Sequence, residues 1–320
     1  MITRVGSIDC GTNSIRLLIA DIDPRSGRLT DIVRRMEIVR LGHGVDKTGV
    51  LAPDALARTL AMTREYAQQC REYAVHDIRF VATSASRDAS NADEFVTGVR
   101  EAFGDLDVAP EVISGVEEAR LSFLGATGDL VAAGMEGPFL VVDIGGGSTE
   151  FVRGTSTVQA ATSVDMGCVR MTERHLRTDP PTPDEIATAI RDIDAVIDRA
   201  IQTVDLGPVR TLVGLAGSVT TITAHLLGLA AYDPAAIHLS TATPAQVQAA
   251  CAELLAMPRQ ERAAQGYMHP GRVDVIGAGA LVWSRVVARV ARHTGLGDEL
   301  PVVTSEHDIL DGIALSLVGR

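Results

Sequence analysis

The sequence has few aromatic residues, a single lysine and no long apolar run. Phenylalanine, tryptophan and tyrosine make up 3% of its 320 residues, so few rings are available to stack on nucleotide bases. No stretch of about 18 apolar residues occurs, which argues against a membrane-spanning helix. The N-terminus lacks an apolar signal segment. We therefore expect a cytoplasmic protein without membrane contacts.

Positive charge is also scarce. The formal net charge is −12, and almost every basic side chain is an arginine because Lys47 is the only lysine. Such a chain is not expected to bind nucleic acid through a general basic surface. A polyanionic substrate would need a local basic groove or a bound cation. Arginine suits bidentate phosphate contacts, although a composition bias of the genome would explain the same count.

The cysteines show neither paired spacing nor a metal-binding motif. No C-x-x-C occurs among the four, which are Cys10, Cys70, Cys168 and Cys251. We expect buried, reduced thiols of a cytosolic protein. Cys10 lies inside a glycine turn, but no neighbouring base marks it as a nucleophile, so we interpret it as a small packed residue.

The predicted elements occur in an order that starts twice. A length of 320 residues with 46% hydrophobic content is enough for two domains. Strands are predicted at 4–10, 15–22 and 28–41, followed by alternating helices and strands, among them a strand at 107–113, up to a helix at 114–133. Three more strands begin near residue 138, and a helix at 306–318 closes the chain. Further helices are predicted at 53–74, 91–103, 167–177, 184–203, 218–229, 243–256 and 271–292. This order predicts an α/β fold with mixed sheets and helices on their faces.

The restart is also visible in the residues. The segment "IDCGTNSIRLL" (8–18) can be laid over "VDIGGGSTEFV" (142–152) with apolar residues matched on both sides. The aligned identities are Asp9 with Asp143, Gly11 with Gly145, and Ser14 with Ser148. The offset of 134 residues is too long for a solenoid repeat and fits two copies of one domain-sized unit.

Both glycine turns are predicted to bind phosphate. Glycine lets an anion approach the backbone closely and helps to aim successive N–H groups at it. The predicted phosphate-binding residues are Gly11, Thr12, Asn13 and Ser14 in the first turn and Gly145, Gly146, Gly147 and Ser148 in the second. Asp9 and Asp143 precede the turns and can approach phosphate only through a cation, so we expect them to hold Mg²⁺, with Mn²⁺ as the alternative. The alternative is a pair of ordinary glycine-rich hairpins with solvated acids, and the occurrence of two such loops, one per repeat, argues against it.

A third glycine turn occurs in "VGLAGSVTTI" (213–222). A predicted strand runs through it into a helix start, where Gly217 and Ser218 are expected to bind phosphate. The alternative is that Ser218 only caps the helix. The chain has no G-K-[ST] sequence and no G-x-G-x-x-G after its first strand, so neither a Walker A loop nor a Rossmann fingerprint is present.

Five segments together resemble the exopolyphosphatase/guanosine pentaphosphate phosphohydrolase (Ppx/GppA) family. They are "IDCGTNSIRLL", "VATSASRDASN", "ISGVEEARLSFLG", "VDIGGGSTEF" and "GLAGSVTT". The resemblance implies two ribonuclease-H-like domains of the actin-like ATPase superfamily, an active-site cleft between them, and a homodimer. The expected first domain is 1–125, with a C-terminal helix at about 304–320 packing back on it, and the second is 126–303.

Longer members of that family carry an additional HD-type domain with metal ligands. This chain has the dipeptides His76-Asp77 and His307-Asp308 without the other ligands. We therefore interpret both dipeptides as ordinary residues.

The segment "ISGVEEAR" (113–120) carries the candidate catalytic acid. Ser114 and Glu117 match a capping box, which gives Glu117 a structural role. Glu118 points about 100° away on a helix. The resemblance places the catalytic acid here, so Glu118 is expected to be the general base or to orient water, although a solvated carboxylate is the alternative. Glu150 is expected to face the same cleft as a second catalytic or metal-holding carboxylate, and Arg87 to clamp phosphate.

The expected activity is Mg²⁺-dependent hydrolysis of the terminal phosphate of linear inorganic polyphosphate. The nearest alternative is the 5′ γ-phosphate of guanosine pentaphosphate, followed by nucleoside tri- and diphosphates. A sugar or acid kinase of the same superfamily is a remote alternative, because it would need an acceptor carboxylate in place of the "SG-x-EEAR" helix start. A nucleotide-gated binding protein is a third, but no peptide-binding extension or polymer signature supports it.

Overall fold

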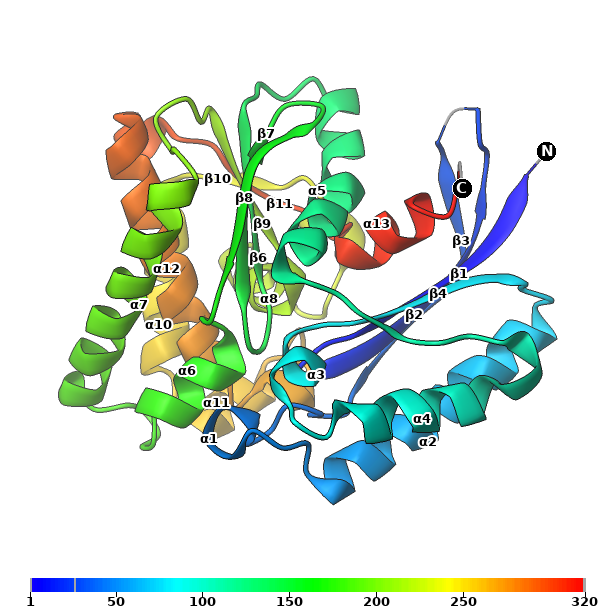
Figure 1. The fold of residues 1–320 in the computed structure, drawn as a ribbon. Coiled ribbons are helices and arrows are strands. Elements are labelled where there is room, and N and C mark those ends of the chain that lie inside the picture. Colours follow the sequence, from blue (N-terminus) through cyan, green and yellow to red (C-terminus); the bar gives the residue numbers. More distant parts are fainter. Residues whose placement is uncertain (1, 26, 319–320) are drawn as a thin grey trace. The chain divides into compact units, whose positions relative to one another are not determined.

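The computed structural model describes residues 2–25 and 27–318 (Figure 1). The chain forms two compact units, one of residues up to 125 and from 309 onward, the other of residues 126–308. Each unit is built on its own mixed sheet with helices packed against it, so the predicted α/β class with two mixed sheets is confirmed. Among the described residues, no helix combines the length and the apolar character that crossing a bilayer requires.

The first unit has a five-stranded sheet in the order β3-β2-β1-β4-β5. Its strands are β1 (Thr3–Cys10), β2 (Ser14–Ile22), β3 (Leu29–Ile38), β4 (Asp77–Ala82) and β5 (Glu111–Val112). Its helices are α1 (Val45–Thr48), α2 (Pro53–Glu72), α3 (Ser84–Asp88), α4 (Ala92–Phe103), α5 (Gly115–Ala132), which continues into the second unit, and α13 (Ile309–Leu315). Strands β1 to β3 form an antiparallel meander, while β4 pairs parallel to β1 and β5 parallel to β4. The carboxyl ends of β1, β4 and β5 therefore share one edge.

The side chains of β1 point alternately into two hydrophobic cores. Ile8 and Cys10 pack with α2 and α4, where Phe80 makes edge contacts at 6.1 Å with the rings of two other phenylalanines. Val5 faces α13 instead, and the hydroxyl of Ser7 donates to the carbonyl of Leu310 at 2.9 Å. Because side chains alternate along a strand, Asp9 lies on the same face as Val5 and Ser7.

The second unit repeats the same strand order and adds one strand. Its sheet runs β10-β11-β9-β6-β7-β8. The strands are β6 (Phe139–Ile144), β7 (Thr149–Gly154), β8 (Val158–Val164), β9 (Thr211–Leu215), β10 (Thr241–Ala242) and β11 (Val302–Thr304). The helices are α6 (Cys168–His175), α7 (Pro183–Thr203), α8 (Ala216–Leu226), α9 (Pro234–Ile237), α10 (Pro244–Ala256), α11 (Arg259–Ala264) and α12 (Ile276–Thr294).

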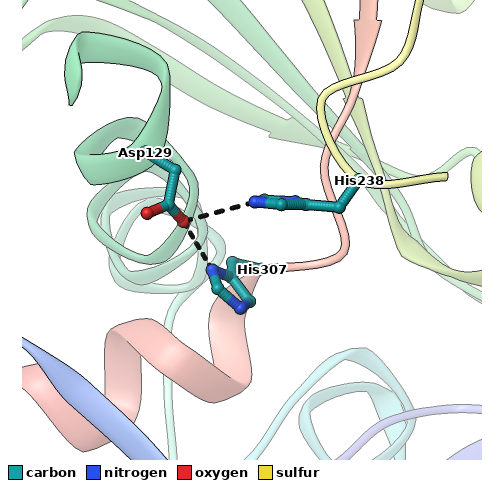
Figure 2. Close-up of side chains that lie close together, drawn as sticks. All are labelled: Asp129, His238 and His307. Atoms are coloured by element: carbon teal, nitrogen blue, oxygen red, sulfur yellow. Dashed lines mark hydrogen bonds and ion pairs between the residues drawn. The ribbon is translucent and has the colours of Figure 1, made fainter. Parts of the chain in front are cut away.

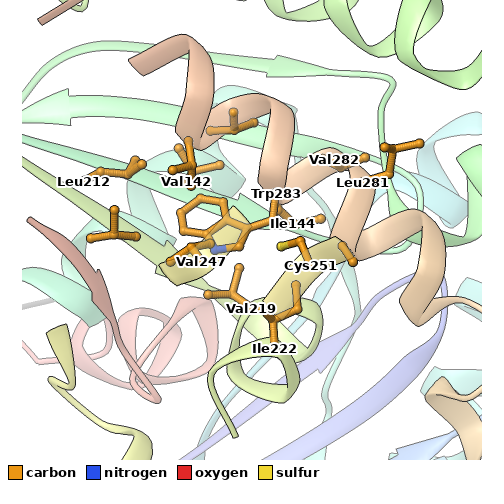
Figure 3. Packing of buried hydrophobic residues seen from close by; sticks show 14 of the residues in the cluster. Val142, Ile144, Leu212, Val219, Ile222, Val247, Cys251, Leu281, Val282 and Trp283 are labelled. Carbon is orange, nitrogen blue, oxygen red and sulfur yellow. The ribbon is translucent and has the colours of Figure 1, made fainter. Parts of the chain in front are cut away.

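The core of the second unit supports the strands that end in glycine turns. Trp283 of α12 is 1% exposed and lies among apolar side chains of β6, β9 and α8 (Figure 3). A Cβ added at Gly214 would come within 2.7 Å of the Trp283 ring, so the glycine leaves the space beside β9 that the ring occupies. The packing fixes the ends of β6 and β9, from which the second and third glycine turns leave.

Several predicted boundaries differ from the structure for local reasons. The strand predicted at 107–113 is reduced to Glu111–Val112, because Pro110 has no N–H to give to a ladder. The helix predicted from 271 begins at Ile276, after a 3₁₀ turn over Pro270–Arg272. The sequence does not predict the two short helices α9 and α11. Helix α9 precedes the helix predicted at 243–256, and α11 lies between that helix and the one predicted at 271–292. The predicted last residues of the final helix, 319–320, lie outside the described residues.

Candidate phosphate-binding active site

The first glycine turn is a hairpin whose carbonyl groups are turned into the protein. The N–H of Gly11 donates to the carbonyl of Ser14 at 2.9 Å and closes the turn. The carbonyl oxygens of Thr12 and Asn13 accept from backbone N–H groups of residues 39–42 at 2.9–3.1 Å. In a trans peptide the following N–H points opposite to the carbonyl. The N–H groups of Asn13 and Ser14 therefore point away from the 39–42 segment, as an anion site requires.

Asp9 is paired with a side chain that the sequence analysis did not identify. Arg16 lies directly opposite Asp9 in the β1–β2 ladder, and its Nε and Nη2 donate to Asp9 Oδ2 at 2.9 and 2.7 Å. Asp9 is only 5% exposed. A cation near this carboxylate thus meets a charge that Arg16 already balances in part.

One buried oxygen in the first turn has no partner among the described residues. It is Oδ1 of Asn13. Buried polar atoms in proteins are nearly always hydrogen-bonded, so an orphan beside a phosphate-type turn suggests a ligand. An oxygen acceptor at this place fits a donor such as a water of a hydrated cation.

Glu118 is held by Arg87. Arg87 Nη1 donates to Glu118 Oε2 at 3.1 Å and to the carbonyl of Ile113 at 2.9 Å. Glu118 is 8% exposed. Arg87, the predicted phosphate clamp, therefore binds Glu118, the predicted base. The hydrogen bond to Ile113 fixes the Arg87 guanidinium on the loop before α5. Glu118 is thus a buried carboxylate whose position is set by an arginine from another element.

The neighbouring glutamate has the separate role that its position predicts. The N–H of Glu117 donates to the hydroxyl of Ser114 at 3.2 Å, which caps α5. The Glu117 carboxylate lies 3.5 Å from the Arg79 guanidinium. The two adjacent glutamates thus face different partners.

These groups collect at the carboxyl edge of the first sheet. Asp9 is paired with Val81 in the parallel register of β1 and β4. The N–H of Thr83 donates to the carbonyl of Cys10 at 3.1 Å, and the N–H of Ile113 donates to that of Ala82 at 3.1 Å. Open α/β sheets bind ligands outside the carboxyl ends of their strands, where this unit carries its acids, its glycine turn and Arg87.

The second glycine turn is an anion cradle of the same kind. The N–H of Gly145 donates to the carbonyl of Ser148 at 3.0 Å. The carbonyls of Gly145 and Gly146 accept from N–H groups in the first turn of α6 at 2.9–3.1 Å, and that of Gly147 accepts from Arg170 Nε at 2.6 Å. Because three successive carbonyls point at α6, the N–H groups of Gly146, Gly147 and Ser148 point to the opposite side.

Two acids face each other beside this turn. Asp143 and Glu150 are directly opposed in the β6–β7 ladder, and they are 6% and 1% exposed. The hydroxyl of Ser163 donates to Glu150 Oε1 at 2.7 Å and orients it. Opposed like charges are unfavourable on a sheet unless a cation lies between them. This oxygen donor set fits Mg²⁺ or Mn²⁺, which prefer carboxylate and water ligands.

The third glycine turn carries an arginine that the sequence analysis did not identify. Ala216 enters α8 with a φ of 67°, a left-handed value that bulkier residues rarely adopt. The Arg272 guanidinium lies against Gly217, where an added Cβ would be 2.4 Å from Arg272 Cζ. Arg272 Nη1 donates to Thr221 Oγ1 at 3.1 Å. Glycine is thus needed at 217 so that a cationic side chain can lie on the backbone of the turn.

The Ser218 side chain is directed into the second unit. A Cβ added at Gly279 would lie 2.5 Å from Ser218 Oγ, and Ser218 is 6% exposed. Burial raises the pKa of the nearby Cys168 thiol above its ordinary value. Any contact of Ser218 with an anion is therefore expected from its backbone N–H. Burial, with the nearby Asp9, likewise raises the pKa of Cys10, as expected for a packed, unreactive thiol.

Each unit carries one hairpin with outward N–H groups and a buried aspartate before the turn, an arrangement that suits the binding of phosphate. The chain belongs to the Ppx/GppA phosphatase family, a hydrolytic family whose signature covers residues 18–295. It is 50% identical over 322 residues to exopolyphosphatase 2 of Mycobacterium tuberculosis, covering 99% of both chains. The crystal structure of an exopolyphosphatase-like protein matches with a TM-score of 0.94 and 46% identity, over 98% of this chain and 97% of that one.

A second kind of relative matches over a shorter stretch. The guanosine-5′-triphosphate,3′-diphosphate pyrophosphatase of Pseudoalteromonas atlantica is 34% identical over 193 residues, which are 60% of this chain and 37% of that protein.

Proposed function

We propose that the chain is an exopolyphosphatase that removes the terminal phosphate of linear inorganic polyphosphate by in-line attack of water. The observation that carries the proposal is the repeated cradle, in which each hairpin turns its carbonyls inward and its N–H groups outward. Full-length similarity to a protein named exopolyphosphatase 2 supports the substrate. A chain of phosphates offers successive anionic groups to such cradles, which need no base-stacking ring.

The proposed chemistry assigns a role to each buried carboxylate. Glu118, oriented by Arg87, accepts the proton of the attacking water as the new bond to phosphorus forms. The bond to the bridging oxygen breaks, and the shortened polyphosphate leaves. Asp143 and Glu150 would hold Mg²⁺, which would screen the phosphate charge, with Mn²⁺ as the alternative and Asp9 as a further holder through water.

The outward N–H groups bind the equatorial oxygens in this proposal. Charge on these oxygens is the main obstacle in phosphoryl transfer, and fixed N–H donors stabilise it without reorganisation.

The quaternary state and location belong to the same proposal. The family resemblance supports a homodimer, and the four buried free thiols suit the reducing cytoplasm. Light scattering of the purified chain measures the mass directly, and a monomer at working concentration would refute the dimer.

The substrate is tested by offering a series with Mg²⁺ and measuring released phosphate. The series contains short and long polyphosphate, guanosine pentaphosphate, ATP and ADP. We expect the highest kcat/KM with polyphosphate. A preference for guanosine pentaphosphate would favour the second function, which the Pseudoalteromonas relative suggests. Phosphate transfer only in the presence of a sugar or acid acceptor would refute hydrolysis.

The proposed base is tested by Glu118→Gln. We expect kcat to fall by about 10²–10⁴-fold, the usual contribution of a general base. The matched control is Glu117→Gln, one residue away in the first turn of α5, which should keep most activity because Glu117 faces Arg79. Circular dichroism checks that both variants fold. Full activity of Glu118→Gln would show that another group takes the proton.

A further inference from the structure

Three potential metal ligands from distant parts of the sequence meet in the second unit. Asp129 lies on α5, His238 follows α9, and His307 lies in the loop after β11 (Figure 2). His307 Nδ1 is 2.5 Å from Asp129 Oδ2, and His238 Nε2 is 3.6 Å from the same oxygen. The two imidazole rings lie 4.7 Å apart between centroids. His307, which the sequence analysis interprets as an ordinary residue, thus has a carboxylate and a second imidazole beside it.

The backbone fixes both histidines before any ion binds. Leu239, next to His238, has a φ of 59°, and its N–H donates to the carbonyl of Thr304 at 2.8 Å. The Ser305 hydroxyl accepts from the N–H of His307 at 3.1 Å and donates to the carbonyl of His307 at 2.7 Å. A site whose ligands sit on such fixed loops loses little conformational freedom on binding.

We propose that Asp129, His238 and His307 bind a divalent transition-metal ion of the Zn²⁺ type, separate from the proposed Mg²⁺ position. One ligand atom of each residue lies within 4.8 Å of the other two. Two imidazoles and one carboxylate suit Zn²⁺ and its neighbours, whereas Mg²⁺ prefers oxygen ligands only. The side chains of Asp129, His238 and His307 are 42%, 23% and 39% exposed, so an ion can reach them and a water can complete the coordination.

Zinc-to-ligand distances near 2.0–2.2 Å place ligands on one ion roughly 3.3 Å apart. The Asp129–His307 pair must therefore open slightly and His238 must approach slightly, which small side-chain rotations allow. The carboxylate oxygen already lies between the two nitrogens, at the centre of the cluster.

One hydrogen bond fixes which nitrogen of His238 faces the cluster. The N–H of Glu306 donates to His238 Nδ1 at 3.2 Å. Nε2 is therefore the nitrogen that faces Asp129, at 3.6 Å from its Oδ2, and that a metal would take.

The site is close to both places where the chain passes between the two units. These passages are at 125/126 and 308/309, and Asp129 and His307 lie four and two residues from them. A bound ion would join the end of α5 to the loop before α13. We expect slower amide hydrogen exchange in residues 126–132 and 305–308 when Zn²⁺ is bound.

The test titrates Zn²⁺ into the full chain, freed of metal by a chelator and without substrate, by calorimetry. We expect one site in the wild type. We expect His238→Ala and His307→Ala each to lower the Zn²⁺ affinity of this site by at least about tenfold. Mutations of groups that only support a metal ligand already have an effect of this size. His238→Gln, which keeps the side-chain size, replaces any alanine variant that fails to fold.

Two controls separate this site from other zinc-binding groups. His293→Ala removes an exposed histidine of α12 whose Nδ1 hydrogen-bonds to the carbonyl of Arg289, and Glu150→Gln alters the proposed Mg²⁺ position. Both should keep the site. Co²⁺ in place of Zn²⁺ should give the visible absorption of a four-coordinate ion, lost in His238→Ala. Unchanged Zn²⁺ affinity in both histidine variants, or loss of the site in Glu150→Gln alone, would overturn the proposal without bearing on polyphosphate hydrolysis.

Discussion

The two glycine hairpins have the same backbone and opposite charge arrangements. Each closes with an N–H to carbonyl bond, from Gly11 at 2.9 Å in one and from Gly145 at 3.0 Å in the other. Each turns its carbonyls toward neighbouring protein and its amides away. The residue opposite the aspartate differs, because it is Arg16 in the first hairpin and Glu150 in the second.

The sequence repeat alone suggests that both hairpins hold the metal equally. The residues opposite the two aspartates indicate that they do not. Asp9 has a guanidinium at 2.7 Å, so its charge is balanced in part within the hairpin. Asp143 faces a second buried carboxylate and gains from a cation there. We infer that the second hairpin holds the metal more strongly and that Asp9 acts through water, while the first hairpin contributes its amides.

The largest expected effect tests where the cation binds. Glu150→Gln removes one of the two opposed charges, and we expect the Mg²⁺ concentration for half-maximal phosphate release to rise by about 100-fold, the upper range for changes at metal-supporting groups. Asp9→Asn should raise it by less than about tenfold, because Arg16 already offsets that charge. Both values come from activity measured against Mg²⁺ concentration.

Equal shifts in the two variants would contradict the inferred difference between the hairpins. Ser163→Ala serves as the control, since it loses only the hydroxyl that orients Glu150 and keeps both charges. Its shift should be smaller than that of Glu150→Gln.

The general plan of this molecule could be predicted from local sequence. Glycine turns between apolar strands gave both hairpins, and the aligned Asp9 and Asp143 revealed the duplication that the two sheets share. Ser114 as a helix cap followed from a three-residue spacing, and its hydrogen bond is present. These features depend on neighbours in the chain.

The partners of the site residues depend on the fold and were missed. Arg272 reaches Gly217 from 55 residues away, and no spacing rule connects them. Asp129, His238 and His307 are likewise separated by long stretches. Arg16 is the exception, because the alignment of the two hairpins places it opposite the aspartate just as it places Glu150.

An intermediate effect tests the ion pair of the first hairpin. Arg16→Gln leaves Asp9 buried without its main counter-charge, and we expect the free energy of unfolding to fall by about 2 kcal/mol, less than for a fully buried pair because Arg16 is 20% exposed. Urea unfolding measures the change. The double variant with Asp9→Asn should recover part of the loss, and failure to do so would mean that Arg16 stabilises the hairpin by packing alone.

The smallest effect compares the equivalent glycines of the two turns. A Cβ at Gly11 would meet its nearest atom at 3.7 Å, which is ordinary contact, whereas a Cβ at Gly145 would lie 3.1 Å from the carbonyl oxygen of Ser148. Gly11→Ala should therefore stabilise the fold by about 0.5 kcal/mol through the unfolded chain. Gly145→Ala must move the Ser148 carbonyl and weaken the bond that closes the turn, so we expect a loss of about 1 kcal/mol.

Thermal unfolding of the two alanine variants and of the wild type measures these changes. If the second turn is the more tightly packed, Gly11→Ala raises the melting temperature and Gly145→Ala lowers it. The added methyl group at Gly145 also displaces the carbonyl of Ser148, which closes the turn that presents the outward amides. KM for polyphosphate should then rise in Gly145→Ala more than in Gly11→Ala. If Gly145→Ala proves more stable than Gly11→Ala, the first turn is the more tightly packed one. The charge difference between the hairpins then has no matching difference in backbone packing.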